Sequence, residues 1–240
     1  MELNCDKKSC VATIAHLEAT HQLHQSSGTR GEADSDVHRL IAECHKLLGN
    51  MDTFSFHIKE AFRLAPTNSG LVHDLLSGIL GYRGVDTNRH TAAEMQLDVL
   101  QWIEDWIEPA LEASASAGVA SRVLAKAHWI VCVSLIELQS RGATLQAKYS
   151  SGSPQMATQV TTVLRRFLKK AHDLDPTDVR FPVELASSYA TSLSGTEFVS
   201  RSQLTNVEYY ARRALALDPQ DSVALSLDAW IREQLAIEEL

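Results

Sequence analysis

The stretch IKEAFRLAP at residues 58–66 decides the fold, because the chain repeats its pattern twice more. The pattern returns as LKKAHDLDP at 168–176 and as ARRALALDP at 211–219. Each copy places an alanine five residues before a proline, with a leucine between them. A small alanine lets a helix approach its neighbour closely, and a proline cannot continue a helix. The three copies therefore predict three equivalent helices, each ending at its proline.

The rest of the chain is also patterned for helices. Apolar clusters alternate with short breaks at glycine or proline, and most segments between the breaks have the length of helices in globular proteins. The sequence contains no Asn-Gly or Asp-Gly hairpin signal and no sustained alternation of apolar and polar residues. Short breaks favour antiparallel neighbours, so the sequence predicts an all-α fold of stacked helix hairpins.

The spacing around the three motifs resembles the tetratricopeptide repeat (TPR), a family built from 34-residue helix pairs. Counted back from Pro66, Ile41 and Ala42 match the apolar and small positions of a first helix, and Leu48-Gly49 matches the turn between the two helices. His45 stands where the family has an aromatic residue. The resemblance implies a right-handed superhelix of stacked hairpins.

The repeat that ends at Pro219 matches in the same way when an insertion separates its two helices. The insertion falls at residues 193–203, after Leu185-Ala186 on the first helix. A terminal helix that packs through Leu225 and Ala229 is expected to cap the open end of the stack.

The segment between Pro66 and Pro176 is longer than two repeats of the family require. Residues 91–107 and 120–138 have the length of extended helices, and the second is apolar on nearly all sides. Glu108-Pro109 predicts a kink or a new helix start, since the residue before a proline avoids helical geometry. The sequence therefore predicts an expanded central region with residues 120–138 in the core.

Two parts of the chain are expected. Residues 1–35 form an N-terminal helical arm, with a helix over 7–25 and a linker rich in Ser, Gly and Asp. Residues 36–240 form the TPR-like helical-repeat domain.

The resemblance implies that the first helices of the repeats line a concave face that binds another polypeptide. The residues placed on this face by the register of the first repeats are Arg39, Glu43, Lys46, His73 and Ser77. Stacked hairpins offer a large surface without chemistry of their own. The sequence therefore predicts a protein–protein interaction module, an adaptor or scaffold subunit whose partner is a protein or peptide.

An alternative follows from a fainter likeness. The order of short motifs over residues 119–219 is similar to that of the helical-repeat domain of the regulator of microtubule dynamics family, which implies microtubule association. The basic patch that would bind the acidic tail of tubulin consists of Arg165, Arg166, Lys169 and Lys170. The competing interpretation is structural, because cations near the end of a helix complement its dipole.

Sequence support for catalysis is absent. The chain has no phosphate-binding loop, nucleophile elbow or zinc-protease motif. We therefore expect no enzyme, no catalytic residue and no cofactor, and keep an enzyme with a pocket in the expanded centre as a third hypothesis. Glu104 and Asp105 are expected to be solvated beside buried tryptophans, Trp102 and Trp106.

The histidines of the N-terminal arm raise the question of a metal site. His16, His21 and His24 lie near Cys5 and Cys10, but zinc requires three or four converging ligands at recognised spacing. No metal is expected, and the histidines of the arm are interpreted as solvated. The other histidines are spread over the chain with no catalytic partner evident beside them.

Charge and composition restrict the remaining classes. A formal net charge of −8 disfavours nucleic acid as a partner. The apolar run at 129–136 is too short to cross a bilayer, so no membrane span is expected. Acidic residues near the N-terminus, and no arginine before Arg30, oppose a targeting segment, and four cysteines without a CxxC pair fit reduced thiols. A cytoplasmic location is expected.

Overall fold

The structure is a computed structural model that describes residues 7–27, 32–66, 68, 99–149, 154–194 and 199–238. Within these residues every regular element is helical, which confirms the all-α class. The elements in chain order are α1 (Lys7–Ser27), α2 (Glu32–Leu48), α3 (Met51–Leu64), the π-helical turn η1 (Ile103–Ile107), α6 (Glu108–Ser116), α7 (Ser121–Tyr149), α8 (Pro154–Leu174), α9 (Arg180–Leu193), α10 (Arg201–Leu217) and α11 (Ser222–Glu238).

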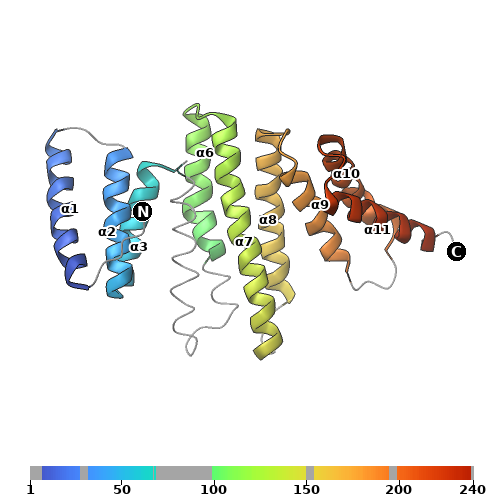
Figure 1. Cartoon of the computed structure of the whole chain (residues 1–240), viewed down its shortest axis with the longest axis horizontal. Helices are drawn as coiled ribbons and strands as arrows, with labels where there is room; N and C mark the ends of the chain where they lie inside the picture. Colours follow the sequence, from blue (N-terminus) through green and yellow to red (C-terminus); the bar gives the residue numbers. More distant parts are fainter. Residues whose placement is uncertain are drawn as a thin grey trace.

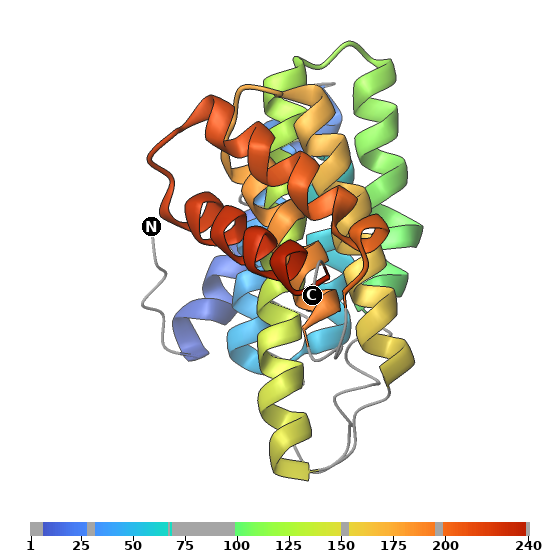
Figure 2. The same cartoon turned by 90° about the vertical axis from the view of Figure 1, so that its right-hand side faces the viewer.

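The helices follow one another in chain order along the long axis of the molecule (Figure 1). Helices that are neighbours in sequence pack together, as α1 does with α2, α2 with α3, and α7 through α11 in succession. Near the C-terminal end, α11 runs across the direction of α7 and α8 (Figures 1 and 2). The architecture is an elongated row of helices, and the right-handed superhelix remains a prediction.

The three proline-ended motifs adopt equivalent structures. Each of α3, α8 and α10 ends two residues before its proline, and the N–H of the residue before the proline donates to the carbonyl of the motif alanine. The three alanines, Ala61, Ala171 and Ala214, are fully buried. The predicted helix ends and the predicted close packing of the alanines are therefore confirmed. The leucine two residues before each proline is half-buried.

A glycine closes the turn between α2 and α3, as the register predicts. Gly49 has φ +81°, a left-handed conformation that costs little without a Cβ. The N–H of Asn50 donates to the carbonyl of His45 at 2.9 Å, and that of Gly49 to Lys46 at 3.1 Å. Gly118, also at φ +81°, ends α6 with the same pair of hydrogen bonds. Both turns are Schellman motifs.

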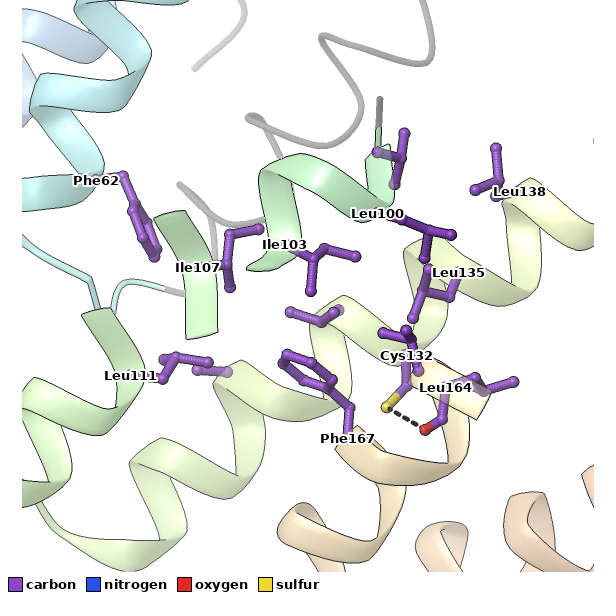
Figure 3. Packing of buried hydrophobic residues seen from close by; sticks show 14 of the residues in the cluster. Phe62, Leu100, Ile103, Ile107, Leu111, Cys132, Leu135, Leu138, Leu164 and Phe167 are labelled. Atoms are coloured by element: carbon purple, nitrogen blue, oxygen red, sulfur yellow. Dashed lines mark hydrogen bonds between the residues drawn. The ribbon is translucent and has the colours of Figure 1, made fainter. Parts of the chain in front are cut away.

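The largest core cluster lies where α3, η1, α6, α7 and α8 meet (Figure 3). It confirms the prediction that residues 120–138 form central core. The buried residues that α7 contributes are Leu124, Ala127, Val131, Cys132, Leu135 and Leu138. The thiol of Cys132 points at the carbonyl oxygen of Leu164, 4.0 Å away, and burial raises the pKa of this thiol well above its usual value.

A π-helical turn accommodates Pro109 without ending the helix. The N–H of Glu108 donates to the carbonyl of Ile103, five residues earlier, and Glu108 keeps helical dihedral angles. The wider turn resolves the clash that a proline makes with the preceding turn of an α-helix. Residues 99–116 are therefore continuous helix, and the expectation that the residue before Pro109 avoids helical geometry is wrong.

Two predicted helix boundaries and one predicted helix face are wrong. α2 begins at Glu32, so the linker is shorter than predicted and the 35/36 boundary falls inside a helix. α7 extends to Tyr149, beyond the end of the helix expected over 120–138. On α11, Leu225 and Ala229 are exposed, whereas Ala224 and Ile231 are buried, because the helix presents a face displaced by one to two residues from the predicted one.

One stretch of the described residues, Ser121–Ser140 of α7, is long and apolar enough to cross a membrane by length and composition. Half of it is buried inside the protein. The core helix of a soluble protein meets the same test, and α7 packs along α8. The expectation of no membrane span therefore depends on this burial, since the shortness of the apolar run does not suffice.

Candidate functional site

A cleft of about 570 Å³ opens between α1, α2 and α3. Three imidazoles line it, one from each helix: His21, His38 and His57. Three carboxylates and one guanidinium share the cleft with them, from Glu18, Asp34, Glu60 and Arg63. We refer to this feature as the histidine cleft.

A direct contact between imidazoles joins α2 to α3. The Nδ1 atoms of His38 and His57 lie 2.9 Å apart, so one ring donates a hydrogen bond to the other. The ring of His45 stacks on that of His57, with centroids 5.9 Å apart and planes 5° from parallel. The ring of His21 meets that of His38 edge-on, with centroids 4.6 Å apart.

A buried carboxylate joins α1 to α2. The side chain of Asp34 is 2% exposed, and its Oδ1 lies 3.0 Å from Nδ1 of His24 and 3.5 Å from Nδ1 of His21. A buried carboxylate requires such partners, because its desolvation is costly otherwise. Asp34 is therefore part of the packing of α1 on α2.

Burial and mutual repulsion keep two imidazoles neutral. Burial, together with the neighbouring imidazoles of His38, His45 and His21, lowers the pKa of His57 to about 4. Burial and then His21 lower the pKa of His38. At neutral pH both rings are uncharged, so one Nδ1 can donate and the other can accept the hydrogen bond.

The interpretation of the arm histidines as solvated is wrong for His21 and His24, which contact Asp34. The remaining histidines are also not all isolated, since α2 and α3 bring three of them together. The signal in the sequence was the spacing of His38 and His45, seven residues apart and thus on one helix face. Asp34 was missed because its segment was interpreted as linker.

Within the part of the chain that the structure describes, no three His, Cys, Asp or Glu side chains are arranged to hold a metal ion. The histidine cleft brings suitable donor types together without this convergence. Among its carboxylates, Asp34 contacts two histidines and Glu60 pairs with Arg63 at 2.9 Å.

Three of the predicted protein-binding residues lie on α2, at the four- and three-residue spacing of one helix face. Arg39 is half-buried and pairs with Glu43 at 3.3 Å, and its Nε is 3.8 Å from Asp36. Lys46 is exposed, with Nζ 5.9 Å from the centre of the Phe54 ring. The other two predicted residues, His73 and Ser77, lie outside the described residues.

Two cations of the basic patch turn toward α6. Arg166 reaches Glu108 at 2.8 Å, and Lys170 reaches Glu108 at 2.9 Å and Glu112 at 3.1 Å. Burial would lower the pKa of Lys170, but the hydrogen bonds to the two glutamates raise it above its usual value. These ion pairs join α8 to α6.

The other two cations turn toward the next helix. Arg165 donates to Oγ of Ser188 at 2.7 Å, and its guanidinium lies 4.0 Å from the centre of the Tyr189 ring. Lys169 also approaches Tyr189, at 5.8 Å. The patch lies before the last turn of α8, so the suggested dipole role is wrong and side-chain contacts account for its structural use.

Neither tryptophan beside the acidic residues is fully buried, so the prediction of buried tryptophans is wrong. Trp106 is 42% exposed and Trp102 half-buried, while Glu104 and Asp105 are exposed as predicted. Nζ of Lys59 lies 4.2 Å from the Trp102 ring centre and 4.7 Å from that of Trp106. The lysine covers both rings, which is why they tolerate their position near the surface.

Comparison with known protein families finds no family model that matches this chain, and a search of curated proteins finds no match. The resemblance to tetratricopeptide repeats therefore depends on the residues and on the helix geometry described above.

Proposed function

We propose that this chain is a non-enzymatic protein–protein interaction module, a TPR-like adaptor or scaffold subunit of a larger complex. The observation that carries the proposal is the equivalence of two hairpins, one formed by α2 and α3 and one by α9 and α10. Ile41-Ala42 and Leu185-Ala186 are buried at matching positions of the first helices. Repeated hairpins of this kind serve proteins that bind partners over an extended surface.

A second similarity supports the same register. The residue three positions after the buried alanine of each first helix carries a ring, which stacks on a ring of the second helix. His45 stacks on His57 at 5.9 Å and 5°, and Tyr189 stacks on Tyr210 at 6.1 Å and 6°. Two hairpins far apart in sequence thus share side-chain geometry as well as helix ends.

The partner surface that we propose is the predicted concave face, represented on α2 by Arg39, Glu43 and Lys46. Its charges are mixed, which suits a peptide that carries both signs. The microtubule alternative would depend on the basic patch, whose cations already contact Glu108, Glu112, Ser188 and Tyr189 and therefore offer a weaker basis. Because Cys132 is a buried thiol directed at a backbone carbonyl, the cytosol remains the proposed location.

Affinity capture from native cells with two charge-swapped variants tests the proposal. Arg39→Glu with Glu43→Arg keeps an ion pair on α2 and reverses its direction. Asp228→Arg with Arg232→Asp does the same to an exposed pair with the same four-residue spacing on α11. We expect the α2 variant to lose a partner that the α11 variant retains. A capture in which both variants behave like the wild type contradicts the proposed surface, and one without any partner contradicts the proposed function.

A further inference from the structure

The two ring pairs differ in one chemical property. Tyr189 and Tyr210 carry phenols, whereas His45 and His57 carry imidazoles, the ring type whose charge can change between about pH 5 and 8. His38 and His21 extend the imidazole contacts from α3 across α2 to α1. The joint between α1, α2 and α3 therefore contains imidazoles. The stacked rings of the equivalent joint between α9 and α10 are both phenols.

The contact between His38 and His57 depends on their protonation. Two nitrogens at 2.9 Å form a hydrogen bond when one carries a hydrogen and the other presents a lone pair. If both rings are protonated, two N–H donors and two positive charges face each other. The contact that joins α2 to α3 then becomes repulsive.

We propose that the joint of α1, α2 and α3 is an acid-sensitive clasp, in which double protonation of His38 and His57 separates α3 from α2 and widens the histidine cleft. The inference goes beyond the proposed function, since it concerns the free chain and requires no partner.

The charged groups around this pair act in both directions. The cleft is lined by Glu18 and His21 from α1, by Asp34 from α2, and by Glu60 and Arg63 from α3. Outside its lining, His24 contacts Asp34 and His45 stacks on His57. For His38 and His57, the carboxylates favour protonation, but burial and the neighbouring imidazoles outweigh them. A pKa lowered in the folded state means that stability is full above pH 6.5 and is lost as pH falls toward about 4.

Other histidines require that the measurement be local. Burial also lowers the pKa of His128 on α7 and of His172 on α8. Their protonation would loosen the centre of the molecule, so a loss of global stability in acid does not identify the clasp. Hydrogen exchange resolved by peptide separates the two effects.

Amide hydrogen exchange of the full chain, read by mass spectrometry at pH 7.5 and 5.0 in buffer with EDTA, tests the proposal. After correction for the intrinsic exchange rate, we expect protection in residues 32–64 to fall about tenfold at pH 5.0. The shift in the pKa of His57 allows a slightly larger loss, but the ring is only half-buried, so solvent screens part of the effect. Residues 180–217 should keep their protection. Unchanged protection over 32–64, or an equal loss over α7 to α10, overturns the proposal.

Two variants and a control assign the effect to the rings. His57→Tyr installs the residue of the equivalent hairpin and should abolish the acid response. His38→Gln retains hydrogen-bonding capacity without a titratable ring and should weaken the acid response. If His57→Tyr does not fold at pH 7.5, His38→Gln provides the test. His16→Gln, at an exposed position on α1, should leave the response intact. An acid response that persists unchanged in the folded cleft variants overturns the proposal.

Discussion

The hairpin of α2 and α3 and the hairpin of α9 and α10 have the same helical plan and different interiors. Both end in a buried alanine followed by a proline, and both stack a ring of the first helix on a ring of the second. The N-terminal pair is imidazole and the C-terminal pair is phenol. The comparison teaches that the spacing of small and apolar residues sets the hairpin, while the ring residues decide how it responds to its surroundings.

The third copy of the motif extends the comparison. Four residues before the motif alanine stand His57 in α3, Phe167 in α8 and Tyr210 in α10. Phe167 packs against a ring of the preceding helix as well, with its centroid 5.4 Å from that of His128. An aromatic position is therefore common to the three helices, and its chemistry varies freely.

The largest expected effect comes from exchanging the buried residue three positions before the motif alanine, which is Ile58 in α3 and Ala211 in α10. Ile58→Ala should lower the free energy of unfolding by about 2–5 kcal/mol, because it leaves a cavity. Ala211→Ile should cost about 1–3 kcal/mol through overpacking. Denaturant unfolding of both variants measures the two losses. If Ile58→Ala costs less than about 1 kcal/mol, the two interiors are not specialised as described.

Transferring the imidazole to the C-terminal hairpin should transfer acid sensitivity. Tyr210 lies near Lys169, Tyr189 and His172, so a histidine there is expected to have a lowered pKa. Tyr210→His should therefore lose about 1 kcal/mol more stability than the wild type between pH 7.5 and 5.0. Denaturant unfolding at the two pH values gives the difference. An unchanged pH dependence would show that the position, and not the ring, controls the response.

The two glycine turns should behave alike although they join different pairs of elements. Gly49→Ala and Gly118→Ala each place a Cβ on a residue with φ +81°, where no neighbouring atom obstructs it. Each should cost about 1 kcal/mol from backbone strain alone. The midpoints of urea unfolding compare them. A loss confined to one variant would mean that one of the turns relaxes.

Surface ion pairs should contribute the least and should not distinguish the hairpins. Arg63 pairs with Glu60 at 2.9 Å on α3, and Arg212 pairs with Glu208 at 2.6 Å on α10, and both arginines are mainly exposed. Arg63→Ala and Arg212→Ala should each change the free energy of unfolding by less than about 0.5 kcal/mol. A larger effect of Arg63→Ala, measured by the same unfolding assay, would show that the charge balance of the histidine cleft supports α3.

Much of the fold was predictable because local rules govern it. Pro66, Pro176 and Pro219 end helices for steric reasons that need no tertiary context, and Gly49 ends α2 for the same kind of reason. The face of α11 was predicted wrongly, since Leu225 and Ala224 are both apolar and only packing selects between them. The extent of α7 was missed because its polar final turns carry no strong signal.

The candidate site was less predictable. His21, His38 and His57 come from three helices, and their approach depends on how those helices cross. Arg165, Arg166, Lys169 and Lys170 were visible in the sequence as one patch, but their partners lie on two different neighbouring helices.

By itself, the sequence determined the helical class, the ends of the repeated helices and the small residues at their contacts, because these follow from steric rules acting within a few residues. Tertiary structure decided which imidazoles meet, which carboxylate is buried among them and which cations find partners inside the protein. Those outcomes depend on distances of a few ångströms between separate helices, and hydrogen bonding, desolvation and charge interactions all change steeply over such distances.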